Sequence, residues 1–284
     1  MEQLADKVAV ITGGASGIGL ALARRLAAER VKLVLLDIEQ AALDAARETL
    51  RGAEVLGIRV DVSQGAAVEA AAAQARERFG VAHIIVNNAG VAGGSGPLWT
   101  ISEADWAWTL GANLWGVIHG IRAFVPPLLA SGEEGHVVNT ASIAGLTSHP
   151  WMGPYTATKH AVVAMSEVLS KELELAGSKI GVSVLCPGFV KTNISHSDRN
   201  RDPADRHPNG PNLNTLMQQL VDAGKPADVI AEAVVAAIRE PRFYILTHDE
   251  MRPALEHRQR DILEGRKPGI DPMFRSLLAG KGTV

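Results

Sequence analysis

Tyr155 and Lys159 are the two residues whose types and spacing best suit acid–base chemistry in this chain. They are four positions apart in a helical pattern, so their side chains share one helix face. Tyrosine normally loses its proton near pH 10, too high for a useful base at neutral pH. A lysine cation about 4 Å away would stabilise the phenolate by roughly 4 kcal/mol at an effective dielectric constant near 20, or about three pKa units. The pair is therefore predicted to act as a general acid and base, although packing on a helix surface would also account for the spacing taken alone.

A glycine-rich turn, residues 12–19, reads Thr-Gly-Gly-Ala-Ser-Gly-Ile-Gly and joins an apolar segment to a helical pattern. Gly13 permits a tight turn, Gly17 lets the backbone approach a pyrophosphate, and Gly19 lets the helix pack closely on the strand. Free N–H groups and the positive dipole end of that helix would face the phosphates. Because the turn lies between a predicted strand and a predicted helix, it indicates a dinucleotide site better than a glycine cluster alone.

Acidic residues follow the next two predicted strands. Asp37 could accept both hydroxyls of an adenosine ribose, although a solvated acid or a helix cap would leave the same pattern. Asp61 could hold an adenine amino group or, equally well, cap a helix. Ser16 and residues 38–40, Ile-Glu-Gln, supply no basic side chain to neutralise a 2′-phosphate. This pattern favours NAD over NADP.

Apolar β-type segments alternate with helical patterns along the chain. Nearly continuous apolar runs are typical of parallel strands covered on both faces. Repeated strand–helix units predict an α/β fold with a doubly wound parallel sheet, and no linker divides the single domain expected over residues 1–284. The expected strands are residues 7–12, 32–37, 54–60, 83–86, 136–140, 180–186 and 243–247. The expected helices are residues 17–29, 40–50, 66–79, 102–129, 153–175, 227–239 and 253–263, with Pro126 and Pro127 disturbing the end of the fourth.

The composition argues against several classes of protein. Hydrophobic residues make up 46% and charged residues 21% of the chain, which suits a packed core rather than disorder. The net charge of -3 argues against a nucleic-acid binder. Scattered histidines and the single Cys186 give no metal-ligand spacing, so no metal is expected and the thiol is predicted to be inert. No signal peptide and no apolar run near the ~18–20 residues that span a bilayer are apparent, which predicts a soluble, cytoplasmic protein without membrane contact.

Two polar segments interrupt the alternation. Residues 191–214 carry three prolines among charged and polar side chains, and residues 248–284 form a C-terminal extension. A solvated loop and a frayed terminus are the simple interpretations. The functional interpretation of the first is a substrate lid around residues 191–222.

Several motifs give the chain a resemblance to a known family. From residue 5 to about residue 247 it resembles the short-chain dehydrogenase/reductase family. The family's TGxxxGIG motif matches residues 12–19, NNAG matches residues 87–90, YxxxK matches residues 155–159 and PGxxxT matches residues 187–192. The family's asparagine and serine match Asn113 and Ser142. All of these matches occur in order and in the expected strand–helix context.

The resemblance implies a Rossmann-type fold with a seven-stranded sheet and NAD as cofactor. Tyr155 would exchange a proton with the substrate oxygen, Ser142 would orient that oxygen, and Lys159 would hold the nicotinamide ribose. Asn113 would help to fix a water that links Lys159 to solvent. The implied cofactor-binding residues are Gly13, Ser16, Gly17, Ile18, Gly19, Asp37, Asp61, Val62, Asn88, Ala89, Gly90, Tyr155, Lys159, Pro187, Gly188, Val190 and Thr192. Family members are usually homotetramers or homodimers built on two long helices, here residues 102–129 and 153–175.

The implied activity is hydride transfer between NAD(H) and a secondary alcohol or ketone. Apolar wall segments predict a fairly apolar substrate, and residues 243–248 are similar to those of dehydrogenases of aromatic and benzylic alcohols. The expected substrate contacts are Ala144, Leu146, His149, Trp151, Met152 and Phe189. A dehydrogenase of steroids or other cyclic hydroxy compounds is an alternative. A non-catalytic NAD-sensing protein is another, although the complete catalytic set argues against it. Core or subunit packing is favoured over ligand binding for the three tryptophans of one helix, Trp106, Trp108 and Trp115.

Overall fold

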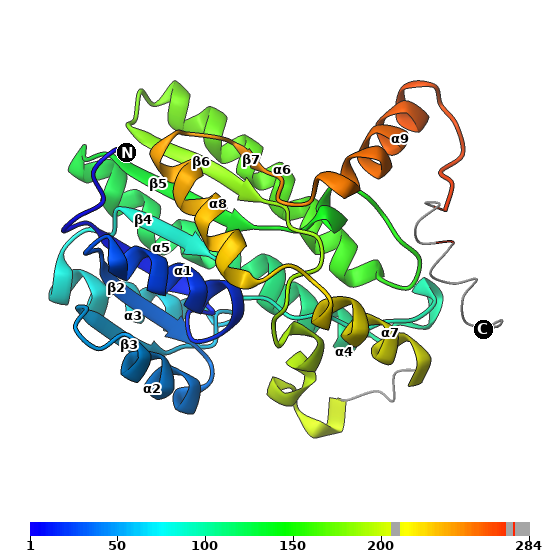
Figure 1. Cartoon of the computed structure of the whole chain (residues 1–284), viewed down its shortest axis with the longest axis horizontal. Coiled ribbons are helices and arrows are strands. Elements are labelled where there is room, and N and C mark those ends of the chain that lie inside the picture. Colours follow the sequence, from blue (N-terminus) through cyan, green and yellow to red (C-terminus); the bar gives the residue numbers. More distant parts are fainter. Residues whose placement is uncertain (206–210, 271–274, 276–284) are drawn as a thin grey trace.

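Within residues 1–205, 211–270 and 275, which the structure describes, seven strands form one parallel sheet (Figure 1). The strands are β1 (Val8–Thr12), β2 (Lys32–Asp37), β3 (Val55–Arg59), β4 (Ile84–Asn87), β5 (Gly135–Thr140), β6 (Ile180–Leu185) and β7 (Tyr244–Ile245). Their order is β3-β2-β1-β4-β5-β6-β7, and every neighbouring pair is parallel. This computed structural model confirms the predicted doubly wound α/β fold.

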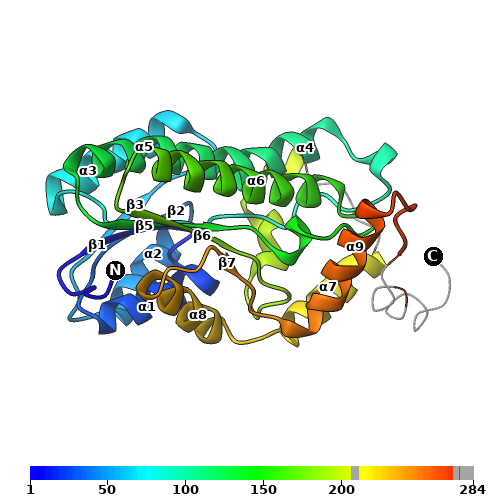
Figure 2. The ribbon, with the colours of Figure 1, turned by 90° about the horizontal axis from the view of Figure 1, so that it is seen from above.

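Helices cover both faces of the sheet (Figure 2). One layer contains α1 (Gly17–Ala28), α2 (Gln40–Thr49) and α8 (Ala227–Arg239), and the other contains α3 (Gly65–Phe79), α5 (Gly116–Ser131) and α6 (Gly153–Leu175). The strands support two layers because both of their faces are apolar. In β1, Ala9 and Ile11 pack with the first layer, and Val8 and Val10 pack with the second.

The carboxyl ends of β1 and β4 position the glycine-rich turn. β1 pairs with β2 on one edge and with β4 on the other, so the loops that follow β1 and β4 diverge. A crevice opens at such a switch point, outside the carboxyl ends of the strands. Residues 13–16 and 88–90 follow the two strands at this place.

The helix expected at residues 102–129 is longer and less regular than predicted. It begins as α4 (Glu103–Leu110), where Ser102 and Asp105 form a capping box, and passes through a π-helical turn, η2 (Gly111–Trp115). It then continues as α5 to Ser131. Pro126 and Pro127 lie inside α5, and the helix continues beyond them to Ser131.

Residues Glu103–Ser131 are long and apolar enough to cross a membrane by length and composition, contrary to the expectation from sequence. The α5 part of this segment nevertheless packs on α3 and β4. A buried helix of an α/β sandwich meets the same two criteria, so this feature is weak support for a membrane span.

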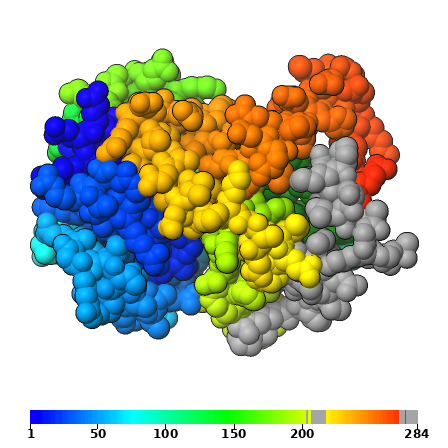
Figure 3. All heavy atoms as spheres, viewed as in Figure 1, coloured from blue at the N-terminus to red at the C-terminus, as the bar shows by residue number. Residues whose placement is uncertain are grey.

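The two polar segments contain helices. Residues 191–222 hold η4 (Ile194–Asn200), η5 (Pro203–Asp205) and α7 (Pro211–Asp222), and α7 contacts η4. Figure 3 shows this part of the chain in yellow-green and yellow on the surface of the molecule. In the extension, η6 (Asp249–Met251) leads into α9 (Arg252–Leu263), which projects from the body (Figure 1). Most of the far tail, residues 271–284, lies outside the described residues.

A buried ion pair ties the first polar segment to α4. Arg201 Nη1 lies 2.5 Å from Asp105 Oδ1, and both side chains are less than a tenth exposed. The Arg201 guanidinium also stacks on the Trp108 ring, 5.1 Å from its centroid. Removing one partner of such a buried pair is strongly destabilising, so Arg201 anchors this segment to α4.

Candidate functional site

A cavity of about 620 Å³ opens at the carboxyl ends of the strands and collects most of the predicted site residues. Asn113, Gly19 and Leu146 are not among its lining residues. The predicted residues that do line it are Gly13, Ser16, Gly17, Ile18, Asp37, Asp61, Val62, Asn88, Ala89, Gly90, Ser142, Ala144, His149, Trp151, Met152, Tyr155, Lys159, Pro187, Gly188, Phe189, Val190 and Thr192.

The glycine-rich turn has the geometry that a pyrophosphate requires. Gly13 and Gly17 have φ angles of 61° and 52°, in the left-handed region that favours glycine. A Cβ on Gly19 would lie 2.1 Å from the Gly13 carbonyl oxygen, so Gly19 serves close packing rather than the cavity wall. The Ser16 side chain makes no capping hydrogen bond at the start of α1. The turn can therefore present its N–H groups to phosphate oxygens.

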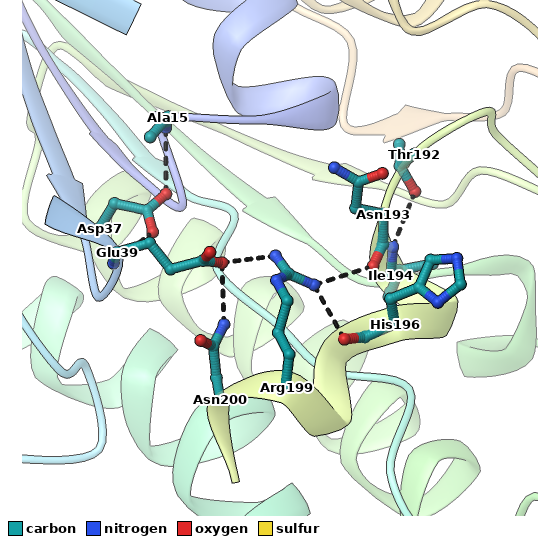
Figure 4. A network of polar contacts seen from close by, with 9 residues as sticks. All are labelled: Ala15, Asp37, Glu39, Thr192, Asn193, Ile194, His196, Arg199 and Asn200. Carbon is teal, nitrogen blue, oxygen red and sulfur yellow. Dashed lines mark hydrogen bonds and ion pairs between the residues drawn. The ribbon is translucent and has the colours of Figure 1, made fainter. Parts of the chain in front are cut away.

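Asp37 lies at the adenosine end of this site, at the carboxyl end of β2 (Figure 4). Its Oδ2 accepts a hydrogen bond from the Ala15 N–H at 3.0 Å, and its Oδ1 accepts one from the Glu39 N–H at 3.1 Å. Burial raises the pKa of the carboxyl, and these backbone donors act in the opposite direction. The side chain is fixed in place and lines the cavity, as a ribose-binding carboxylate must.

Two loops complete the predicted cofactor wall. The Thr12 Oγ1 accepts hydrogen bonds from the backbone N–H groups of Asn88 and Ala89, at 2.8 and 3.0 Å, which fixes the loop after β4 against the glycine-rich turn. Asp61 lines the cavity, and its Oδ1 also accepts a hydrogen bond from the Ser63 N–H at 2.9 Å. The structure therefore supports a turn-stabilising role for Asp61 beside its place in the wall.

Ser142, Tyr155 and Lys159 converge on the other end of the cavity. Ser142 precedes η3 (Ile143–Gly145), and Tyr155 and Lys159 lie in the first turns of α6. The Lys159 Nζ lies 5.5 Å from the centroid of the Tyr155 ring and donates a hydrogen bond to the Thr140 carbonyl at 3.0 Å. The two α6 residues share one face, as their spacing predicts.

The pKa directions differ from the sequence-based expectation. Burial raises the pKa of Tyr155, and a hydrogen bond with Ser142 opposes this effect. Burial also lowers the pKa of Lys159 to about 8. The expected net lowering of the Tyr155 pKa is therefore not found, because desolvation of the phenolate is the largest effect on this group. A raised pKa keeps the Tyr155 hydroxyl protonated at neutral pH, the form that can protonate a ketone oxygen.

Asn113 lies behind the cavity wall, in the π-helical turn η2, and is fully buried. Its Oδ1 accepts a hydrogen bond from the Val91 N–H at 2.7 Å, and its Nδ2 donates to the Val91 carbonyl at 3.0 Å. A Cβ on Gly90 would lie 3.0 Å from the Asn113 Oδ1 and 3.6 Å from the Lys159 Nζ. Single π-helical turns often occur at functional sites, and this one places the amide near Lys159.

Five of the six residues predicted to contact substrate line the cavity. Leu146 is the exception, because its side chain packs against the apolar cluster that includes Val162, Val163 and Val184. Trp108 lines the cavity and also packs on the Arg201 guanidinium, whereas Trp106 and Trp115 are not among the lining residues. No sequence motif lies near Trp108, so the sequence alone did not indicate that it would line the cavity.

Several cavity residues lay outside the sequence prediction. Glu39, Arg199 and Asn200 meet at the adenosine end (Figure 4). The Arg199 guanidinium contradicts the expectation that no basic side chain lies near Asp37. It comes from the polar segment 191–222, which only the fold brings to β2.

His248 supports the loop after β6, residues 187–192. Its Nδ1 accepts a hydrogen bond from the Gly188 N–H at 3.0 Å, and its Nε2 lies 3.0 Å from the Phe189 carbonyl oxygen. A Cβ on Gly188 would lie 2.9 Å from the imidazole ring. Burial lowers the pKa of His248, which favours the neutral ring that this pair of contacts requires. Cys186, just before the loop, is buried and its pKa is raised to about 12, which agrees with an inert thiol.

Comparisons with known proteins agree with this geometry. The family model described as short chain dehydrogenase matches residues 7–203. The chain is 35% identical over 283 residues to a CLA biosynthesis dehydrogenase/reductase of Lactiplantibacillus plantarum, covering 96% of this chain and 99% of the relative. It is 37% identical over 262 residues to a 1-deoxy-11-beta-hydroxypentalenate dehydrogenase of Streptomyces avermitilis, covering 91% of each.

A solved structure gives the same assignment. A short chain dehydrogenase/reductase from Burkholderia phymatum, in complex with NAD, superposes with a TM-score of 0.92 at 46% identity. The match covers 96% of this chain and 99% of that chain. The family model, the relatives and the sheet order all agree. The chain belongs to the short chain dehydrogenase family.

Proposed function

We propose that the protein is an NAD-dependent alcohol dehydrogenase or ketone reductase that acts on a fairly apolar secondary alcohol/ketone pair. The observation that carries this proposal is the convergence of Ser142, Tyr155 and Lys159 on one cavity together with the glycine-rich turn and Asp37. Membership of a dehydrogenase family makes the protein an oxidoreductase.

The cofactor assignment to NAD has two supports. The turn at residues 13–19 fits a pyrophosphate, and Asp37 is placed to accept the ribose hydroxyls. The similar Burkholderia phymatum protein was solved in complex with NAD. When bound, the nicotinamide supplies or accepts the hydride at the substrate carbon.

The chain's own residues would handle the proton. The Tyr155 hydroxyl would donate its proton to the substrate oxygen during reduction and accept it during oxidation. Ser142, whose Oγ accepts a hydrogen bond from the Ala144 N–H at 3.2 Å, would hold the same substrate oxygen. Lys159 would stabilise the phenolate and bind ribose hydroxyls, and Asn113 would fix the loop at Val91 beside it.

The substrate class follows from the wall of the cavity. Trp108, Trp151, Met152 and Phe189 face the space that a substrate would occupy, and such surfaces favour apolar, including aromatic, groups. A cyclic hydroxy compound is a second candidate, because the Streptomyces avermitilis relative is named for an 11-beta-hydroxypentalenate compound. Residues 191–222 would act as the lid over this space, since several of them line it.

We also propose a homo-oligomer, a tetramer or a dimer, in the cytoplasm. Trp115 on η2 is 50% exposed and Val168 on α6 is 52% exposed, which suits association of the two long helices with a second copy. Size-exclusion chromatography with light scattering tests this assembly. A monomer at micromolar concentration would contradict it.

The function is tested by NADH fluorescence during turnover. A panel of secondary alcohols and ketones, aromatic, aliphatic and cyclic, is offered with NAD(H). Turnover of an apolar member supports the proposal. NADH binding without turnover of any member would favour the non-catalytic, NAD-sensing alternative.

A further inference from the structure

Glu39 and Arg199 join the adenosine end of the cavity to the polar segment 191–222 (Figure 4). The Arg199 Nη2 donates a hydrogen bond to Glu39 Oε1 at 2.5 Å, and the Asn200 Nδ2 donates to the same oxygen at 2.9 Å. The Arg199 Nη1 also donates to the carbonyls of Asn193 and His196, at 3.2 and 3.0 Å. The guanidinium is therefore held by its own segment on one side and by Glu39 on the other.

Glu39 also contacts Asp37, the carboxylate proposed to bind the ribose. Its backbone N–H donates to Asp37 Oδ1, and both residues line the cavity. The hydrogen bond from Arg199 lowers the pKa of the Glu39 carboxyl, so Glu39 is charged at neutral pH. Glu39 is the N-cap residue of α2, and its side chain makes no capping hydrogen bond, so substitution of this side chain removes no capping contact.

Arg199 and Lys159 are the two lysine or arginine side chains among the described residues that line the cavity. Lys159 lies at the opposite end, beside Tyr155. At the adenosine end, a 2′-phosphate would meet Asp37 and Glu39, and the guanidinium that could neutralise it is engaged by Glu39. Guanidinium groups bind phosphate well through paired N–H donors.

We propose that Glu39 is a second cofactor-specificity residue, which acts through Arg199. By holding the guanidinium, Glu39 withholds from a 2′-phosphate the cation that would bind it, and it adds a negative charge beside Asp37. Without the Glu39 carboxylate, the Arg199 guanidinium keeps its hydrogen bonds to the Asn193 and His196 carbonyls and loses the anion that competes with a 2′-phosphate for it. This inference rests on the proposed dinucleotide site and deepens it.

The test uses fragments of the cofactor, so it does not depend on turnover. Binding of adenosine 2′,5′-bisphosphate and of 5′-AMP is measured by calorimetry in the full-length protein carrying Asp37→Ser, so that repulsion by Asp37 does not hide a gain. Glu39→Ala is then added, alone and with Arg199→Gln. Arg59→Gln is the matched control, because the Arg59 Nε donates to the Ile38 carbonyl at 3.1 Å and its side chain is outside the cavity lining.

Adding Glu39→Ala is expected to tighten bisphosphate binding about tenfold or more, the effect of one charge-assisted contact. The affinity for 5′-AMP should change little. Arg199→Gln should abolish the gain, and Arg59→Gln should preserve it. An unchanged bisphosphate affinity, or a gain that survives Arg199→Gln, would overturn the proposal. If wild-type protein does not bind 5′-AMP, the proposed dinucleotide site itself is overturned.

Discussion

The Lys159 ammonium lies 5.5 Å from the centre of the Tyr155 ring, and its hydrogen bond goes to the Thr140 carbonyl. Both side chains lie where burial disfavours their charged forms. The protein therefore holds an acid and a cation side by side in a low-dielectric site, where small changes of protonation have large consequences.

The buried lysine is predicted to reduce stability at neutral pH. Its pKa is about 8 in the folded protein and 10.5 ordinarily, so the folded state binds fewer protons between these values. The full desolvation penalty, roughly 3 kcal/mol, applies below pH 8 and diminishes as the pH rises to 10.5. The substitution Lys159→Met removes this desolvation penalty, and it also removes the hydrogen bond to the Thr140 carbonyl.

The expected net result is a variant about 1 kcal/mol more stable at pH 7, with little turnover. Urea unfolding at several pH values measures the difference. The difference in stability should fall between pH 8 and 10.5 and reverse its sign, because the penalty that wild type loses over this range is larger than the variant's advantage at pH 7. Stability curves that run parallel over this range would contradict the assigned burial of a charged lysine.

Asp37→Ala is predicted to erase most of the preference for NAD over NADP. The substitution removes hydrogen bonds to the ribose, about 1.5 to 3 kcal/mol for a charged acceptor, and relieves repulsion of a 2′-phosphate. In wild-type protein these effects together correspond to a hundredfold or greater preference. The measurement is kcat/KM with each cofactor. Equal use of the two by wild type would show that Asp37 has another role.

Residues 191–222 are predicted to become more resistant to protease when ligands bind. Ile194, Ser195 and Ser197 line the cavity, so cofactor and ketone would contact this segment and close it. Limited proteolysis, with cleavage sites read by mass spectrometry, should show slower cutting within 191–222 in the presence of both ligands. Identical rates with and without them would argue against a lid. Arg201→Ala, which breaks the buried pair with Asp105, should accelerate cutting.

The sequence predicted those parts of the site whose geometry is set by residues close together along the chain. The turn at 12–19 and the YxxxK spacing each fix geometry within one strand–helix unit, so the sequence alone carries them. Other features depend on the whole fold. Glu39 and Arg199 are 160 residues apart, and no local pattern brings them together.

Packing decides two further features. Leu146 lies two positions after the cavity residue Ala144, yet its side chain packs in an apolar cluster, because a loop has no fixed alternation of faces. Lys159 stands one helical turn from Tyr155, and the depth of its burial, which sets its pKa, comes from the sheet and loops around it. Spacing along α6 predicts which side chains are neighbours but not how much water surrounds them.

The most direct test of the account is turnover by Tyr155→Phe. The substitution removes only the hydroxyl that is assigned to proton transfer, while the cofactor site stays intact. Tyr244→Phe is the matched control, because the chain has two tyrosines and the Tyr244 hydroxyl donates to Glu167 at the surface, at 2.6 Å. Both variants are compared with wild type by NADH fluorescence, in binding and in turnover of the best ketone. Tyr155→Phe is predicted to lose about 100- to 10,000-fold in kcat with NADH binding nearly unchanged, and Tyr244→Phe to keep its activity. Near wild-type turnover by Tyr155→Phe would contradict the proposed chemistry.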